Sequence, residues 1–506
     1  MTRWAWVIDQ TRCIGCHACT TACKSENEVP VGVFRTWVKN VEVGTFPDVK
    51  RHFAVLRCNH CAEPPCVDVC PVTAMYQRPD GLVDFDHDLC IGCKACMQAC
   101  PYDAIYIDPD SNTAAKCNFC SHRVDEGLLP ACVVVCPAEA LLFGDLDDPT
   151  SKVRQAVGAQ STTVRRPEQG TRPQAYYVGA HAATLDPLAS RHDAAYMWAD
   201  RPAHDHRELV PLTRRATRRA AAEPPARVAY DVPRQRTWSW KVSSYIWTKG
   251  IAAGLGVLAA MWHFVVPADG ARIGGMLAPW IALAFLTLTG ALLVADLKRP
   301  ERFWTILTRP QWKSWLARGA FIISVYGASL VAWIVLDAIG RNDALAVLAP
   351  IVVVFGLLTA AYTAWLFAQC EGRDLWQTRL LLPHLVLHAL GSGAAVMVIV
   401  AVMSGSPMGS WLRAAFLIGV LGTGVIALAD AFGRHRTANG AAAARALTRG
   451  AQARLFWAAL VIGVVLPVIL AFAGTIGAVA AAVLALAGWW LYGHAFVLAG
   501  QGPPIS

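Results

Sequence analysis

The sequence lacks the segments that mark exported proteins, because Met1–Gln10 has neither an apolar core nor a twin-arginine pair. We therefore expect the amino-terminal part of the chain to stay in the cytoplasm. The sequence also has no clear nucleotide-binding glycine loop and no domain large enough to bind molybdopterin. We therefore expect no small-substrate active site within the chain. Charged residues make up only 16% of it, and the net charge of +9 is not grouped as a nucleic-acid patch, which excludes nucleic acid as a partner.

Cysteine is scarce after residue 136, whereas 16 of the 17 cysteines lie between Cys13 and Cys136. They form four groups of four, of which two have the spacing C-x2-C-x2-C-x3-C and three end directly before a proline. The groups are Cys13/Cys16/Cys19/Cys23, Cys58/Cys61/Cys66/Cys70, Cys90/Cys93/Cys96/Cys100 and Cys117/Cys120/Cys132/Cys136. In bacterial ferredoxins three cysteines of such a run hold one [4Fe–4S] cluster and the fourth reaches a second cluster. The sequence therefore predicts two cluster pairs, or four [4Fe–4S] clusters.

Two other uses of cysteine agree less well with this spacing. Zinc sites use paired C-x2-C hooks, in which a third cysteine three residues further on has no role. A disulfide framework needs an oxidising compartment, which the missing export signal does not support. The spacing leaves open whether the groups pair in chain order or as an outer and an inner pair. His17, His60 and His122 lie among the cysteines, and we expect surface or hydrogen-bonding roles for them because each group is complete.

The composition changes abruptly near residue 240, where a segment rich in cysteine, proline and charge gives way to long apolar runs. Eight runs are long enough to cross a bilayer as helices, for which about 20 apolar residues suffice. Their predicted ranges are 245–266, 275–297, 317–339, 345–369, 380–403, 411–432, 455–474 and 476–499. We therefore expect a multidomain fold, α+β followed by membrane all-α. It comprises a ferredoxin-like four-cluster module at 1–185, a basic linker at 186–240 and an eight-helix transmembrane bundle at 241–506.

Positively charged loops set the predicted orientation in the membrane. The loops on the side of the amino terminus carry 21 Lys and Arg near the span ends, whereas the alternate loops carry only Arg272, Arg341 and Arg413. Both termini and the four-cluster module are therefore predicted to face the cytoplasm. Arg214–Arg219 in the linker would either contact anionic lipid headgroups or form a solvated charge run.

Polar residues inside the predicted spans gather in the half nearest the four-cluster module. They are Lys249, Asp296, Tyr326, Tyr362, Gln369, His384, His388, Asp430 and His494, whereas His263 and Asp337 lie toward the outer face. Ionisable groups in hydrocarbon are costly and are therefore functional candidates, although any one of them could instead snorkel or pair with another. Histidine, tyrosine and carboxylates can hydrogen-bond a quinone and move its protons. The predicted quinone site contains His384, His388, Asp430 and Lys249, with Asp296 and Tyr362 as further candidates.

Residues 1–185 resemble the four-cluster iron–sulfur subunit of the DMSO, polysulfide and nitrite reductase systems. The resemblance lies in the order of the groups, the four residues between Cys61 and Cys66, and the long insertion between Cys120 and Cys132. It implies that the first group pairs with the fourth and the second with the third. The implied ligand sets are Cys13/Cys16/Cys19/Cys136, Cys117/Cys120/Cys132/Cys23, Cys58/Cys61/Cys66/Cys100 and Cys90/Cys93/Cys96/Cys70. Because Cys93 is present, the resemblance implies four-iron clusters throughout.

Residues 240–506 resemble the polysulfide-reductase-type (NrfD/PsrC) eight-helix anchor, through Tyr245–Gly250, Asp296–Trp304 and Ala499–Ser506. The resemblance implies electron exchange with quinone, either menaquinone or ubiquinone, in the bacterial cytoplasmic (inner) membrane. It also implies a molybdopterin-containing catalytic subunit as partner, so the chain is expected to be a quinone-linked oxidoreductase component. The cytoplasmic orientation favours a dehydrogenase of the sulfite or formate kind. A hydrogenase partner, or a passive anchor that only tethers the clusters, is the alternative.

Overall fold

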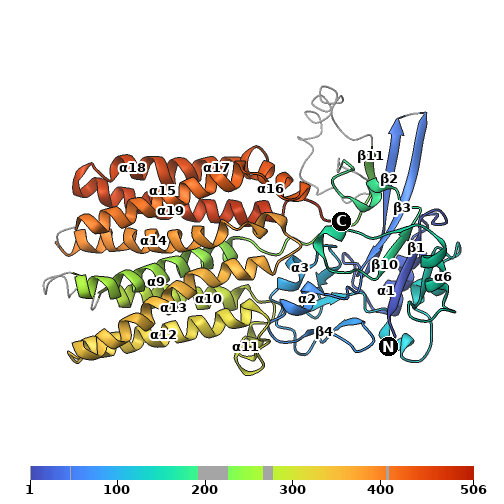
Figure 1. Ribbon diagram of the computed structural model, residues 1–506, viewed down its shortest axis with the longest axis horizontal. Helices are drawn as coiled ribbons and strands as arrows, with labels where there is room; N and C mark the ends of the chain where they lie inside the picture. Colours follow the sequence, from blue (N-terminus) through green and yellow to red (C-terminus); the bar gives the residue numbers. More distant parts are fainter. Residues whose placement is uncertain (1, 46, 192–225, 266–276, 406–408) are drawn as a thin grey trace.

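The computed structural model describes residues 2–45, 47–191, 226–265, 277–405 and 409–506. The chain forms two parts that lie end to end along the long axis of the molecule (Figure 1). The cysteine-rich domain, residues 2–191 and 226–239, contains short strands and helices, and the helical domain, residues 240–506, is a bundle of long helices. The carboxyl terminus returns to the junction between the two domains.

A four-stranded sheet with the order β8-β1-β10-β9 organises the cysteine-rich domain. Its strands are β1 (Trp4–Asp9), β8 (Leu141–Asp145), β9 (Thr162–Thr163) and β10 (Ala175–Val178). The largely apolar strand β1 is buried between β8, which runs antiparallel to it, and β10, which runs parallel. Because β1 ends just before Cys13 and β8 begins just after Cys136, their pairing brings the first and last cysteine groups together.

A second sheet, of order β11-β2-β3, extends away from the helical domain (Figure 1). Its strands are β2 (Thr36–Thr45), β3 (Asp48–Arg57) and β11 (Ala226–Tyr230), and the hairpins β4–β5 (Met75–Gln77, Val83–Phe85) and β6–β7 (Ile105–Ile107, Ala114–Lys116) lie between cysteine groups. β11 falls within the predicted linker, so that this part of the linker belongs to the sheet. Arg214–Arg219 lie outside the described residues.

Short helices follow the cysteine loops and the strands. They are α1 (Ala18–Glu26), α2 (Pro65–Asp68), α3 (Ala95–Ala99), α4 (Ser121–Val124), α5 (Ala131–Val134), α6 (Lys152–Ala159), η1 (Pro167–Gln169) and α7 (Ala182–Leu185). Four of them carry a cysteine within or directly after the helix: α1, α2, α3 and α5. These helices therefore determine the direction in which each group sends its last sulfur atoms.

Within the described residues, seven helical segments are long and apolar enough to cross a membrane. They are α10 (Ala278–Asp296), α12 (Trp315–Ala338), α13 (Asn342–Ala368), α14 (Leu381–Met403), α15 (Ser410–Phe432), the run Ala453–Leu470 and α19 (Gly474–Gly500). The run consists of α17 (Ala453–Leu460), η6 (Val461–Val465) and α18 (Leu466–Leu470). The first predicted span corresponds to α9 (Trp240–Val265), which is not among the seven. The predicted count of eight spans is therefore not confirmed.

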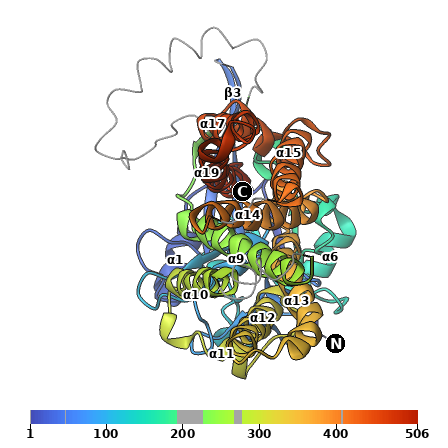
Figure 2. The ribbon, with the colours of Figure 1, turned by 90° about the vertical axis from the view of Figure 1, so that its left-hand side faces the viewer.

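The long helices form two groups of four that meet along α9 and α14 (Figure 2). The first group is α9, α10, α12 and α13, and the second is α14, α15, the run Ala453–Leu470 and α19. A Cβ atom on Gly393 of α14 would lie only 2.3 Å from the carbonyl carbon of Gly254 on α9. Small residues thus let these two backbones approach each other closely, as is common between membrane helices.

Connections between the helices attach the helical domain to the cysteine-rich domain. The basic segment 297–314, which contains η4 (Pro300–Arg302) and α11 (Thr305–Thr308), donates backbone N–H groups to carbonyls of the second and third cysteine groups. Several ion pairs cross the junction, and two of them are short and largely buried: Lys94 Nζ lies 2.8 Å from Asp296 Oδ2, and Arg166 Nη2 lies 2.8 Å from Asp374 Oδ2 at the start of η5 (Asp374–Gln377). The basic loop and the cysteine-rich domain therefore share one end of the bundle.

Candidate functional site

The structure places the first cysteine group against the fourth. Two sets of facing sulfur atoms result, each with three cysteines of one group and the last cysteine of the other. They are Cys13/Cys16/Cys19/Cys136 and Cys23/Cys117/Cys120/Cys132. Helix α1 explains this exchange, because it begins within the first group and carries Cys23 toward the fourth.

The second and third groups face each other in the same way. Their sets are Cys58/Cys61/Cys66/Cys100 and Cys70/Cys90/Cys93/Cys96. Cys100 follows α3 directly and is its C-cap, so this helix directs Cys100 toward the second group. The spacing leaves two pairings of the groups open. In the structure the first group faces the fourth, and the second group faces the third.

The four sets follow one another in a single order. Neighbouring sets approach through the pairs Cys19/Cys132, Cys117/Cys58 and Cys66/Cys96. At one end Cys16 is exposed to solvent, and at the other Cys93 faces Cys370 in the helical domain. The arrangement therefore connects the outer surface of the cysteine-rich domain with the helical domain.

Hydrogen-bond donors point at the sulfur atoms, as is typical of thiolates that hold an iron–sulfur cluster. Backbone N–H groups donate from Gly92 to Cys90 at 3.4 Å, from Met75 to Cys70 at 3.4 Å and from Ala140 to Cys136 at 3.3 Å. Gly92 has a φ of +67°, and a Cβ atom there would lie 2.5 Å from Cβ of Lys298. A glycine is thus required where the third cysteine group touches the helical domain.

Burial raises the pKa of two of the most deeply buried thiols, well above the usual range at Cys66 and to about 12 at Cys93. Thiols with such pKa values do not ionise near neutral pH by themselves, so a bound metal is needed to stabilise their anionic form. The buried cysteines therefore fit the role of ligands to bound metal clusters, and not that of free reactive thiolates.

The histidines among the cysteines have packing and hydrogen-bonding roles in the structure. His122 Nε2 lies 2.9 Å from Glu26 Oε1, and the ring of His17 packs edge-on against Tyr230. Burial lowers the pKa of His60 well below its usual range, and Nδ1 of its neutral ring accepts a hydrogen bond from a backbone N–H. Cys16 and His17 complete a C-x-x-C-H pattern, but Cys16 lines the same cavity as Cys19 and Cys136.

A pocket of about 540 Å³ lies between α9, α10, α12 and α13 at the end nearest the cysteine-rich domain. Cys93 forms part of its wall, as do the polar side chains of Tyr245, Asp296 and Tyr362. Tyr245 is buried and interacts with both Tyr362 and Asp296. Most of the remaining wall is apolar, and a cavity of this size and lining is suited to an organic ligand.

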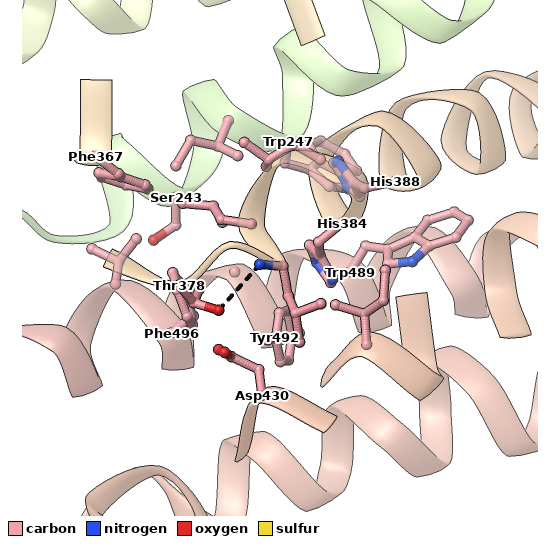
Figure 3. Close-up of a pocket in the computed structure, with 17 residues that line it drawn as sticks. Ser243, Trp247, Phe367, Thr378, His384, His388, Asp430, Trp489, Tyr492 and Phe496 are labelled. Carbon is pink, nitrogen blue, oxygen red and sulfur yellow. Dashed lines mark hydrogen bonds between the residues drawn. The ribbon is translucent and has the colours of Figure 1, made fainter. Parts of the chain in front are cut away.

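A second, much smaller cavity of about 40 Å³ lies between the two helix groups. Figure 3 shows His384, His388 and Asp430 around it, together with Trp489 and Tyr492. Asp430 forms a side-chain hydrogen bond with Thr378, and Nδ1 of His384 has no hydrogen-bond partner among the described residues. A space of this volume accommodates a few water molecules but no organic ring system.

Lys249 lies between the two cavities and lines neither of them in the structure. Its ammonium group hydrogen-bonds Thr363 and lies 4.3 Å from the ring centroid of Tyr362. His388 contacts the same helix, α9, at the next residue, Gly250. A Cβ atom on Gly250 would lie only 2.5 Å from the His388 ring. The six predicted quinone-site residues are thus divided: Asp296 and Tyr362 lie at the large pocket, His384, His388 and Asp430 at the small one, and Lys249 between them.

Comparison with known families agrees with this two-domain arrangement. Residues 6–74 and 49–146 match the 4Fe-4S dicluster domain, and residues 231–502, more than half of the chain, match the family described as polysulphide reductase, NrfD. The protein belongs to the NrfD family. Its helical domain is of the NrfD type, and the described part of that domain contains seven helices long and apolar enough to cross a membrane. This NrfD protein is therefore a multi-pass membrane protein that also carries iron–sulfur cluster domains.

Curated relatives of this NrfD protein match over roughly two fifths of its length. It is 44% identical over 202 residues to one of the subunits of tetrathionate reductase from Salmonella typhimurium, covering 39% of the present sequence and 80% of the relative. One of the subunits of sulfite dehydrogenase from Allochromatium vinosum is 42% identical over 200 residues, covering 35% and 83%. A polypeptide of polysulfide reductase from Wolinella succinogenes is 42% identical over 181 residues, covering 35% and 94%.

Tyr245 of the large pocket is not among the predicted quinone-site residues, and some residues predicted from their polarity have other roles. Tyr245 was noted only as part of a family-like segment, although a tyrosine one turn before Lys249 on the same helix was a usable signal. Gln369 hydrogen-bonds backbone groups. Its Oε1 accepts from the N–H of Trp315 at 2.8 Å, and its Nε2 donates to the carbonyl of Lys313 at 2.8 Å. A polar residue in a predicted span therefore does not by itself mark a ligand site.

Proposed function

We propose that this NrfD protein is the electron-transfer and quinone-reactive membrane subunit of a molybdopterin oxidoreductase complex. It relays electrons between a catalytic subunit in the cytoplasm and the quinone pool, menaquinone or ubiquinone. The four sets of cysteines hold four [4Fe–4S] clusters, which supply one-electron carriers. The position of Cys93 carries this proposal, because this residue belongs to the last cysteine set and also lines the large pocket of the helical domain.

The arrangement of the sulfur atoms supports clusters over isolated metal ions. Over the residues that the structure describes, no three His, Cys, Asp or Glu side chains are placed to hold a single metal ion. Two of the cysteine sets instead surround small cavities, at Cys13 and at Cys90, and backbone N–H groups donate to their sulfur atoms. A zinc site would need its four sulfur atoms around one point.

The large pocket, and not the cavity at His384 and His388, is the proposed quinone site. Quinone reduction takes two electrons and two protons, so the site needs hydrogen-bond donors and a proton route beside an electron carrier. Tyr245 and Tyr362 offer O–H donors for a quinone carbonyl, and Asp296, held by Lys94, offers a carboxylate. The histidines lie at a cavity that is too small for a quinone ring.

The proposed catalytic partner docks at the far end of the cysteine sets. Cys16 is exposed there, and the neighbouring Ile14 side chain is 60% exposed, which leaves an apolar surface beside the first cluster site. The relatives are named as parts of tetrathionate reductase, polysulfide reductase and sulfite dehydrogenase. This likeness supports a catalytic subunit as partner; we propose that this subunit is of the molybdopterin type, and that the NrfD protein itself converts no small substrate.

Electron exchange with quinone tests the proposal against a passive anchor. When anaerobically purified protein is reduced with dithionite and freed of the reductant, addition of a menaquinone or ubiquinone analogue should reoxidise the clusters. Recovery of the cluster absorbance that reduction had bleached, together with loss of the reduced-cluster EPR signals, reports the reaction. Rapid oxidation by an artificial dye together with no response to either quinone would show that the helices only tether the clusters.

The orientation in the bacterial cytoplasmic membrane is proposed from the basic loops, which lie at the same end as the cysteine-rich domain. In spheroplasts, protease added from outside should leave residues 1–240 intact, whereas it should cleave them in inverted vesicles. A reporter fused after Ser506 that is active only outside the cytoplasm would contradict this orientation and the cytoplasmic partner with it.

A further inference from the structure

Arg57 is the last residue of β3 and directly precedes Cys58, but its guanidinium group reaches the outer cysteine sets. Nη1 donates a hydrogen bond to Cys132 Sγ at 3.1 Å, and Cys117 and Cys19 are further electrostatic neighbours. The side chain is completely buried, and its guanidinium carbon lies 4.2 Å from the ring centroid of Trp6. A full positive charge is thus held in the protein interior beside the sulfur atoms of one set.

This charge has no acidic counterpart in the described part of the chain. No carboxylate there lies within ion-pair distance of Arg57, and Nε and Nη2 have no hydrogen-bond partner. Lys94, the cation next to Cys93, is instead neutralised by Asp296 at 2.8 Å. An isolated cation in a low-dielectric interior is costly, so the negative charge of a sulfur-bound cluster is the compensation that the structure offers.

Other groups around the same set act in the same direction. Asn27 Nδ2 lies 3.6 Å from Cys120 Sγ and 3.8 Å from Cys23 Sγ, so it can donate to both. Lys24 interacts with Cys23 and has carbonyl groups, not a carboxylate, as its hydrogen-bond acceptors. Glu26, the acid that faces Cys120, is itself paired with Arg123 at 3.3 Å and with His122.

Lys116 is a further buried cation, and it serves as a comparison. Its ammonium group hydrogen-bonds the carbonyl oxygens of Val83 and Cys117 and interacts with Cys66 of the neighbouring set, but it donates to no sulfur atom in the described structure. Direct donation to sulfur by a side-chain cation therefore distinguishes the set at Cys132. Hydrogen bonds to the sulfur atoms and local charge are among the factors that set cluster reduction potentials.

We propose that Arg57, assisted by Asn27, gives the cluster held by Cys23, Cys117, Cys120 and Cys132 the highest reduction potential of the four. Reduction adds one electron and one negative charge to the cluster, and the uncompensated guanidinium stabilises this reduced state. The second position in the series is then the one at which an electron resides longest. The inference rests on the proposed function in one respect, namely that the four sets hold four clusters.

An EPR-monitored redox titration of Arg57→Met tests the inference. One midpoint potential should fall until the equilibrium constant for its reduction is about tenfold smaller, which is about 59 mV for a one-electron couple. The other three potentials should change little, and Arg57→Lys, which keeps the charge, should show a smaller fall. Arg12→Met is the matched control, because Arg12 directly precedes Cys13 but is 48% exposed and paired with Glu139.

Unchanged potentials in an Arg57→Met protein with its full iron content would overturn the inference, and so would equal falls in the Met and Lys variants. If Arg57→Met binds less iron, the order in which the clusters of the unaltered protein are reduced tests the inference instead. The first cluster to be reduced should be the one whose signal Cys120→Ser alters, and reduction of another cluster first would contradict the inference. Fewer than four clusters in the unaltered protein would instead contradict the proposed function.

Discussion

Replacing Gly290 with phenylalanine should block quinone access and slow quinone-linked electron transfer on the order of 100-fold, as misplacement of a reactant by about 1 Å already can. Gly290 lies on α10 in the wall of the large pocket, and a Cβ atom added there meets no other atom within 4 Å. The new ring can therefore enter the open space without displacing a helix. Stopped-flow reoxidation of the reduced clusters by a quinone analogue measures the effect.

Gly493→Phe is the matched control for this substitution. Gly493 lies on α19 in the wall of the small cavity, and a Cβ atom added there also meets nothing within 4 Å. Iron content and oxidation by an artificial dye should be normal in both variants, because neither position contacts a cysteine set. If Gly493→Phe abolished the reaction with quinone and Gly290→Phe did not, the quinone site would lie at His384, His388 and Asp430.

Cys23→Ser should damage the cluster of Cys117, Cys120 and Cys132 and spare the one of Cys13, Cys16 and Cys19. The reason is that Cys23 faces the fourth group although it belongs to the first in sequence. Iron should fall from about 16 atoms per chain toward about 12, at four atoms per cluster. Electron transfer from the outer end to quinone should be almost lost, since the damaged cluster is second in a single series.

Cys370→Ser provides the control, because Cys370 is equally buried and faces Cys93 without belonging to a cysteine set. Its thiol donates to the carbonyl of Leu366 at 3.5 Å, a contact that a serine hydroxyl can keep. The iron content of this variant should be unchanged. A Cys23→Ser spectrum in which the altered cluster is the one bound by Cys13, Cys16 and Cys19 would contradict the crossed ligation.

The cysteine sites and the two-domain organisation were accessible from the sequence because both depend on local spacing. A run of four closely spaced cysteines indicates a cluster site, and a long apolar stretch indicates a membrane span, whatever the fold of the rest of the chain. The strand β11 was not accessible, because it is a short segment stabilised by its pairing with β2, which lies far away in the chain. Arg227, which lies within this strand, was expected in the basic linker, whereas in the structure it pairs with Glu42 at 2.6 Å.

The candidate quinone site was only partly predictable, because hydropathy gives the depth of a residue in a span and not the neighbour that it faces. Lys249 and His388 were expected in one cluster on these grounds. In the structure the Lys249 ammonium group faces Thr363 on α13, while His388 contacts Gly250 from α14. The two side chains are still electrostatic neighbours, but they pack against different helices, and this order of helices is not visible in any single span.

The nested pairing of the cysteine groups has a consequence for synthesis of the protein on the ribosome. Under the proposed ligation, all ligands of the two inner clusters have been translated once Cys100 has been added. Of the two outer clusters, one lacks a ligand until Cys132 and the other until Cys136, although Cys13 was made more than a hundred codons earlier. The amino-terminal cysteines must therefore wait, reduced and unligated, while the inner module matures. The hydrophobic spans emerge only after the last ligand, so that cluster insertion can precede membrane integration.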